Sequence, residues 1–362
     1  MSHSNVSRTI FLRTVAFLAV LALAGVPAQA ALEESRSFAS DRLTVRNLIG
    51  EITVEGHRGS DFEVEVRVSG SDARDGLIQL QAGEDELNVQ FPAGQTEYVY
   101  PKLGDRSKTE VNLNEGSFLS ELIPDGAGMR RVEISGSGQG LELWADVTVR
   151  VPLGGELEIE HGVGKVVAEN VDGDLELATR SGGVSVERVS GTLSVATGSG
   201  RVTLTRVDGE SVKVATGSGH VVIEDCDGEE MKIATGSGGV TLESLRGHSI
   251  EIGTGSGEIR AERIDADSMN IGTGSGTVTL ALDRMGEGKF NVGTGSGDIV
   301  LTMPPGASAD VHAETNSGEI EVDLGKQVQF SKQEEDEVRL TVGNGGASVD
   351  LGTGSGDIRI RS

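Results

Sequence analysis

The chain has 362 residues, of which 57 are acidic and 31 basic, so its formal charge is −26 at pH 7. This charge disfavours nucleic acid and anionic membrane surfaces as partners, because binding them requires neutralising negative charge. Aromatic residues make up 3% of the chain while glycine reaches 53 residues, unlike a globular enzyme with a thick core. We therefore expect a thin core of Val, Ile and Leu.

Residues 1–30 have the three-part pattern of a cleaved secretory signal peptide. Arg8 and Arg13 precede an apolar run from Thr14 to Gly25, and Ala28-Gln29-Ala30 follows. The run is too short to span a bilayer as a helix, and no later stretch has the required length. We predict an exported chain without a transmembrane segment, located in the periplasm, on the cell surface or outside the cell. Its mature part keeps 29 basic and 57 acidic residues.

Cys226 is the only cysteine, which excludes an intrachain disulfide and a lipid anchor at the cleavage site. It takes the position that Val207 and Leu245 have in neighbouring repeats. We predict a small buried side chain rather than a reactive thiol, because Asp225 and Asp227 would raise its pKa.

A repeat of about nineteen residues dominates the rest of the chain. Related tetrapeptides begin at His161, Thr179 and Thr315, and successive starts from 161 to 315 are 18 to 21 residues apart. The last interval, from 315 to 353, is 38, or twice nineteen. The sequence Thr-Gly-Ser-Gly itself begins at Thr197, Thr216, Thr235, Thr254, Thr273, Thr294 and Thr353. Such a fixed period is the signature of a repeat architecture.

Each unit is expected to contain two short strands and two turns. In the unit from Thr197 to Ala215, Val202/Leu204 and Val212/Val214 alternate with polar residues, and Val207-Asp208-Gly209 separates the two runs. Identical turns at a fixed step favour parallel stacking, in which each residue lies on its equivalent about 4.8 Å away. We predict an all-β fold, a parallel β-solenoid (single-stranded β-helix) wound right-handedly.

The chain divides into four parts. Residues 1–30 are the signal peptide, 31–91 form N-terminal strands or cap coils, 92–131 form an insertion loop, and 132–362 form regular solenoid repeats. At the end, the strand 357–362 would leave an open edge, which Arg359 and Arg361 protect from pairing with another chain.

The insertion carries the most suggestive aromatic residues, Tyr98, Tyr100 and Phe118. If they are exposed, they form a speculative binding loop; alternatively, they attach the loop to the rod.

The Thr-Gly-Ser-Gly corners permit several interpretations. A phosphate loop requires a following helix, whereas here a strand follows. Calcium-binding rolls repeat an aspartate, but the residue after the last glycine varies, as at Arg201, His220 and Glu258. A threonine face for ice or a crystalline polymer is disfavoured because the threonines fall on the inward side of the alternation. We interpret them as a structural ladder whose hydroxyls bond backbone at the corner.

No catalytic, cofactor-binding or metal-ligating set emerges. The mature chain has five histidines at different positions of the repeat, without a serine-nucleophile elbow or zinc-ligand spacing. Parallel β-helices can host carbohydrate-active enzymes, but those have longer, irregular coils. We predict that the protein is not an enzyme and has no cofactor.

The order of features resembles a known family. Leu-Thr-Val-Arg-Asn-Leu-Ile-Gly-Glu-Ile-Thr-Val-Glu-Gly (43–56) is followed by Val-Thr-Val-Arg-Val-Pro (147–152) and then by serial Ser-Gly-x-Val/Ile strands. This resembles the bacterial exported β-strand-repeat family of unknown function whose members carry the label "putative adhesin". The resemblance implies a cell-envelope β-solenoid with no established catalytic residues.

Three hypotheses follow. The first is a non-catalytic envelope or surface scaffold, adhesin-like, whose partner is an envelope or surface glycan or protein. The second is a soluble glycan-binding module, and the third is a carbohydrate-active β-helix enzyme.

Overall fold

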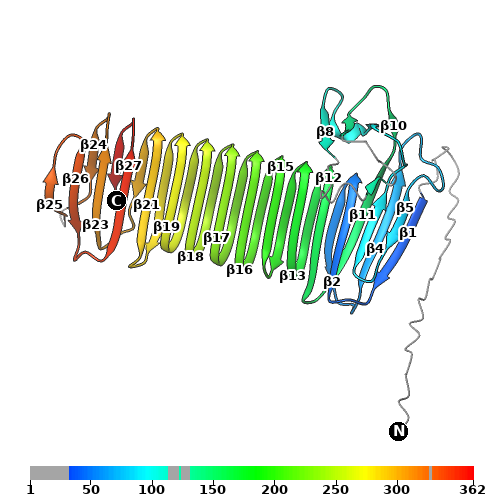
Figure 1. The fold of residues 1–362 in the computed structure, drawn as a ribbon. Helices are drawn as coiled ribbons and strands as arrows, with labels where there is room; N and C mark the ends of the chain where they lie inside the picture. Colours follow the sequence, from blue (N-terminus) through cyan, green and yellow to red (C-terminus); the bar gives the residue numbers. More distant parts are fainter. Residues whose placement is uncertain (1–31, 113–121, 124–130, 326–327) are drawn as a thin grey trace, which may run out of the picture.

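The computed structural model describes residues 32–112, 122–123, 131–325 and 328–362. The predicted signal peptide and Phe118 lie outside these residues. The described chain is built almost entirely of strands, stacked in register into one rod (Figure 1). The predicted all-β parallel solenoid is confirmed.

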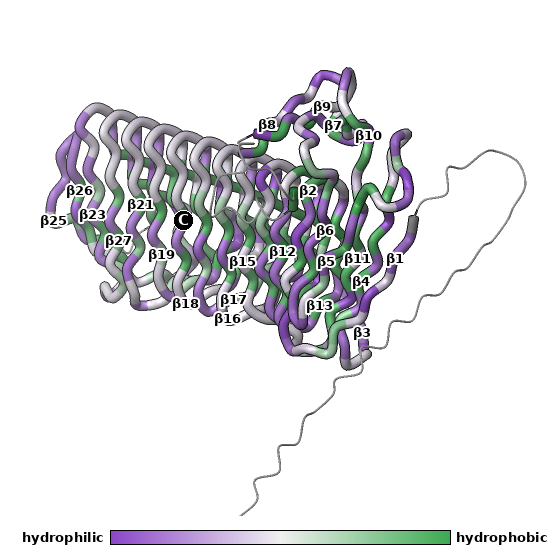
Figure 2. Tube along the Cα trace, turned by 45° about the vertical axis from the view of Figure 1, so that its right-hand side comes forward, coloured by the Kyte–Doolittle hydropathy of each residue, from purple (hydrophilic) through white to green (hydrophobic). Residues whose placement is uncertain are grey.

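Parallel coils that repeat with the sequence period form the middle of the rod. Val202 pairs with Val221 and Thr216 with Thr235, so each residue lies on its equivalent in the next coil. The predicted inward residues, such as Leu204 and Val214, are buried, and Figure 2 shows this apolar pattern repeating from coil to coil. The strands are β14 (Val184–Ser190), β15 (Leu193–Ser199), β16 (Val202–Ser218), β17 (Val221–Ser237), β18 (Val240–Ser256) and β19 (Ile259–Ser275).

The second bend of each coil is sharper than the expected turn at 207–209. Strands β16 to β19 continue through it, and a single residue in the left-handed conformation changes the chain direction, as at Arg206 with φ 56°. This conformation costs energy for a residue other than glycine. Contacts between neighbouring bends offset part of the cost: Arg206 pairs with Glu187, and Arg263 Nε donates to Ser244 Oγ at 2.9 Å.

The N-terminal end is closed by strands that leave the parallel pattern. The first coil, β2 (Arg42–Ile49) and β3 (Ile52–His57), stacks on β12 (Gly155–Val163) and β13 (Val166–Ser181). Its other side pairs in parallel with β6 (Glu86–Gln90) and β11 (Trp144–Pro152). Antiparallel strands then cover this end: β5 (Gln79–Ala82) pairs with β6, β4 (Phe62–Ser69) pairs with β11, and β1 (Leu32–Phe38) pairs with β4.

The insertion interrupts this end layer between β6 and β11, where other coils have their glycine corner. It contains a second sheet and a short 3₁₀ helix, η1 (Pro101–Leu103), beside the rod (Figure 1). The strands of this second sheet are β7 (Glu97–Val99), β8 (Lys108–Asn112), β9 (Arg131–Ser135) and β10 (Leu141–Glu142). Residues 131–142 belong to it rather than to the regular solenoid, since β9 pairs with β7 and β8.

At the C-terminal end the coils are stacked out of sequence order. Thr353 pairs with Thr294 on one side and with Thr315 on the other, so the last coil of the chain lies between two earlier ones. The prediction of an open edge at Arg359 and Arg361 is therefore wrong, because their strand is paired on both sides. The strands are β20 (Val278–Met285), β21 (Lys289–Ser296), β22 (Ile299–Thr302), β23 (Ala309–Thr315), β24 (Ile320–Asp323), β27 (Ala347–Thr353) and β28 (Ile358–Arg361).

An antiparallel hairpin covers part of this end. Strand β26 (Glu337–Val342) pairs with β23, and β25 (Val328–Gln333) pairs with β26. The segment that forms this hairpin separates β24 from β27 in the sequence, which is why the last coil can return between earlier ones.

Candidate functional site

The Thr-Gly-Ser-Gly threonines line the inner side of one corner along the rod. All seven are buried, as are Thr179 and Thr315. Most donate a hydrogen bond to a glycine carbonyl of a neighbouring coil; Thr197 Oγ1 lies 3.1 Å from Gly182 O, and Thr353 Oγ1 lies 2.9 Å from Gly297 O. These hydroxyls are used by the backbone, as the structural interpretation requires.

The last glycine of the tetrapeptide is required by close backbone stacking. Gly200 has φ 152°, a value that side chains rarely adopt. A Cβ atom at Gly219 would lie 1.9 Å from Gly200 O. Glycine at these corners therefore permits coils to approach each other and needs no ligand to explain it.

The threonine ladder begins with two different polar residues. Asn47 pairs with His161, and His161 pairs with Thr179. Asn47 Nδ2 donates to Ala145 O at 2.8 Å, and the two ring nitrogens of His161 each lie 3.0 Å from a backbone carbonyl oxygen. Complete burial outweighs these carbonyl contacts and lowers the pKa of His161 to about 4.

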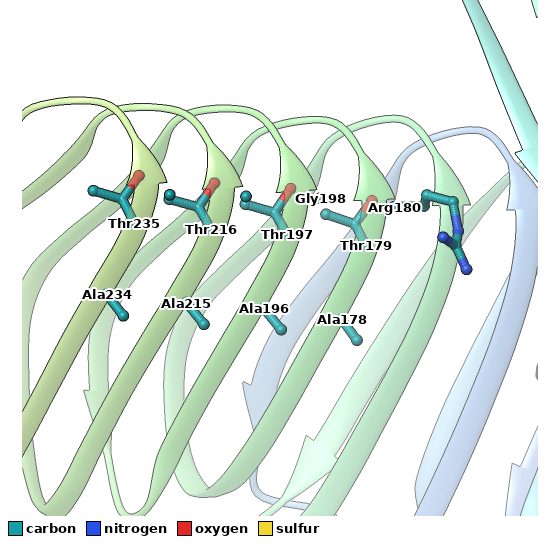
Figure 3. A pocket seen from close by; sticks show the side chains of 12 residues that line it. Ala178, Thr179, Arg180, Ala196, Thr197, Gly198, Ala215, Thr216, Ala234 and Thr235 are labelled. Atoms are coloured by element: carbon teal, nitrogen blue, oxygen red, sulfur yellow. The ribbon is translucent and has the colours of Figure 1, made fainter. Parts of the chain in front are cut away.

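A strip of small residues follows the same corner on the outer face. Ala178, Ala196, Ala215 and Ala234 form a row beside the threonines (Figure 3), and Gly253 continues it. The strip borders a shallow trough of about 600 Å³. Side chains that could hydrogen-bond a ligand are few there.

Cys226 is 2% exposed, which confirms the predicted burial. Burial, assisted by Asp225, raises the pKa of its thiol to about 11. A thiol that is both buried and protonated is a poor nucleophile.

The two tyrosines of the speculative binding loop are buried, so they do not form an exposed binding surface, and the alternative, attachment of the loop to the rod, holds for them. Tyr98 packs edge-on against Phe91, with ring centres 5.7 Å apart, and Tyr100 packs against Trp144 at 5.6 Å. Since Phe91 and Trp144 flank the insertion, both tyrosines help to attach the small sheet to the rod. Burial raises the pKa of each hydroxyl.

A cleft of about 460 Å³ lies between η1 and the corners of the first coils. Lys102 on η1 contacts the rod: its Nζ lies 2.7 Å from Glu51 Oε2 and 3.5 Å from Asp146 Oδ2. The backbone N–H of Glu51 also donates to Asp146 Oδ1 at 2.8 Å. This network fixes η1 above the corner and gives the cleft its upper wall.

The lower wall of the cleft follows one position of the repeat, the residue after the corner. Lys165, Gly183 and Arg201 occupy this position in consecutive coils, as the bonds from Val166 N to Gly183 O and from Val184 N to Arg201 O establish. Two exposed cations thus flank a glycine, about 10 Å apart across two coil steps.

A cluster of metal ligands is absent from the described ranges. No group of three His, Cys, Asp or Glu residues there could hold a metal ion. The histidines are dispersed; His248, for example, contacts Asp267 at 2.9 Å on the outside of the rod. In the part of the chain that the structure describes, no helix has the length and apolar character needed to cross a membrane.

Sequence reasoning missed the cleft. The available signal was that Lys165 and Arg201 share one position of the repeat. The position of Lys102 was not predictable, because it depends on how the inserted sheet packs on the rod.

Solenoid, corner ladder and inserted sheet together define an all-β repeat protein. The chain belongs to the Toastrack DUF4097 family, whose profile matches residues 51–292 and 269–361. This agrees with the resemblance expected from the sequence. None of the curated proteins compared with the chain matches it.

Solved structures of similar proteins share little sequence with the chain. A "putative cell adhesion protein" from Clostridium sporogenes ATCC 15579 is 11% identical, with 91% of this chain and 99% of that chain covered and a TM-score of 0.21. A "putative adhesin" from Parabacteroides distasonis ATCC 8503 is 9% identical (91% and 98% covered, TM-score 0.38). Another "putative adhesin", from Bacteroides fragilis NCTC 9343, is 12% identical (93% and 100% covered, TM-score 0.33).

Proposed function

We propose that this protein is a non-catalytic interaction scaffold of the cell envelope or cell surface, adhesin-like in use. The observation that carries the proposal is the regularity of the central coils. From Val202 to Ser275 each residue stacks on its equivalent without an insertion, so the outer faces are continuous ladders rather than an enclosed reaction site. Repeat rods of this kind present long binding surfaces.

The outward charges also favour a scaffold over an enzyme. Many acidic residues pair with an arginine of the neighbouring coil, as Asp227 does with Arg246 at 3.0 Å and Asp267 with Arg284 at 2.9 Å. Hydrogen bonds from His248 and Arg284 lower the pKa of Asp267, whereas a general acid requires a raised pKa.

Location is tested by antibody labelling of intact and permeabilised cells. Labelling of intact cells supports adhesion. Labelling only after permeabilisation contradicts the adhesin use and leaves a periplasmic scaffold.

Deletion of one coil tests the scaffold itself. Removing residues 216–234 joins Ala215 to Thr235, which restores the register because Ala215 already stacks on Ala234. We expect a folded, shorter rod and a graded loss of cell adhesion. Removing only 216–224 is the control, since it breaks the register and should unfold the coils. Complete loss of activity from one outward carboxylate substitution, with the fold intact, would indicate an enzyme.

A second candidate function is a glycan-binding module. The cleft beneath η1 favours it, because it is a concave site with charged and hydroxyl side chains in its lining, between η1 and the corners of the rod.

A further inference from the structure

We propose that the cleft beneath η1 binds the carboxylate group of an acidic saccharide. The inference rests on the second proposed function and names its ligand class and its residues. The first observation is the charge of the residues that line the cleft. The chain has an excess of acidic residues, yet three cations, Lys102, Lys165 and Arg201, line this one cleft, together with a single acidic residue, Glu51.

Two of these cations are available to a ligand. Lys102 is neutralised by Glu51 and Asp146. Lys165 and Arg201 are exposed, and neither forms an ion pair with any residue that the structure describes. Many other arginines on the rod do pair, including Arg206, five residues after Arg201 in the sequence. An arginine fork with a nearby lysine suits a planar carboxylate.

Hydroxyl groups make up much of the remaining lining. Ser185 and Thr203 stack on each other in neighbouring coils beside the cations, which places two hydroxyls about 4.8 Å apart. Tyr100 is 2% exposed, lines the cleft and makes no side-chain hydrogen bond to a described residue. Its hydroxyl can therefore donate to or accept from a ligand in the cleft.

Size and composition favour a sugar over a peptide. About 460 Å³ lies within the range of small-molecule sites. The hydroxyls and cations of the lining match the hydroxyls and carboxylate of a uronic acid, and Leu103 and Val184 are its aliphatic side chains.

The test is calorimetric titration of the mature protein with a short galacturonic acid oligomer. We expect binding that weakens as salt is raised. Lys165→Ala and Arg201→Ala should each weaken it about tenfold to a hundredfold. Tyr100→Phe should weaken it less and leave the thermal midpoint almost unchanged. Arg180→Ala is the matched control, because Arg180 of the intervening coil lines the trough instead and forms no ion pair with a described residue, so affinity should stay unchanged.

Other outcomes overturn the inference. No binding to the acidic oligomer, or equal binding to the neutral galactose oligomer, removes the carboxylate assignment. If Lys165→Ala and Arg201→Ala both bind the oligomer as tightly as the unsubstituted protein does, the site lies elsewhere. Tighter binding of a glutamate-rich peptide or of inorganic phosphate through the same residues rejects the saccharide. Cell labelling and coil deletion test the scaffold independently, so failure of one proposal does not decide the other.

Discussion

The central coils and the N-terminal end of the rod cover their apolar core in different ways. In the centre, each corner is a copy of the previous one, with a buried threonine, close glycines and parallel neighbours on both sides. At the N-terminal end, Asn47 and His161 take the threonine position, antiparallel strands cover the last layer, and an inserted sheet replaces the corner. Repetition therefore stabilises the interior, while irregular elements close the end and create the cleft.

The largest expected effect tests whether the central corners depend on close contact between the backbones of neighbouring coils. Gly219→Ala would put a Cβ atom 1.9 Å from Gly200 O, so we expect the free energy of unfolding to fall by about 3 kcal/mol or more. Urea denaturation monitored by circular dichroism measures it.

Gly253→Ala is the matched control for this substitution. Gly253 stacks on Ala234, and an added Cβ meets nothing within 4 Å. We expect a gain of about 0.4–1 kcal/mol through the lower entropy of the unfolded chain. Equal effects at the two glycines would show that the corner tolerates a side chain.

The next largest effect is a pH dependence of folding stability that arises at the N-terminal end of the rod and not in the central coils. The pKa of His161 is lowered from 6.5 to about 4 in the folded protein, so the unfolded chain binds the extra proton first. The contribution of the neutral ring is present above pH 6.5 and is lost as pH falls toward 4, by up to about 3 kcal/mol.

This prediction is measured as a difference between variants. His161→Thr should lower stability at pH 7 and flatten the fall of unfolding free energy between pH 6.5 and 4. The exposed His220 provides the control, and His220→Thr should leave that slope unchanged. If His161→Thr leaves the slope unchanged, the His161 ring does not cause the fall of the unfolding free energy between pH 6.5 and 4.

The smallest effect lies within the central ladder. Thr235 Oγ1 donates to Gly219 O at 3.2 Å, whereas Thr216 Oγ1 is buried without a partner among the described atoms. Thr235→Val should cost about 1 kcal/mol, and Thr216→Val should be neutral or stabilising. The two urea midpoints would decide it, and equal losses would indicate that both hydroxyls are bonded in solution.

Much of the fold follows from the sequence because the repeat is local. The spacing of Thr197, Thr216 and Thr235 and the alternation at Val202 and Leu204 fix which side chains face inward, and parallel stacking then repeats one solution in every coil. Cys226 was predictable for the same reason, since its position in the repeat defines its burial.

The tertiary structure alone decided the features that depend on contacts between distant segments. Period and alternation carry no signal for the return of β27 and β28 between earlier coils, or for the burial of Tyr98 and Tyr100 against Phe91 and Trp144. The cleft belongs to the same class, because Lys102 meets Lys165 and Arg201 only when the inserted sheet packs against the corners. A periodic sequence determines how equivalent residues stack, but where the stack ends and what covers it depend on long-range packing.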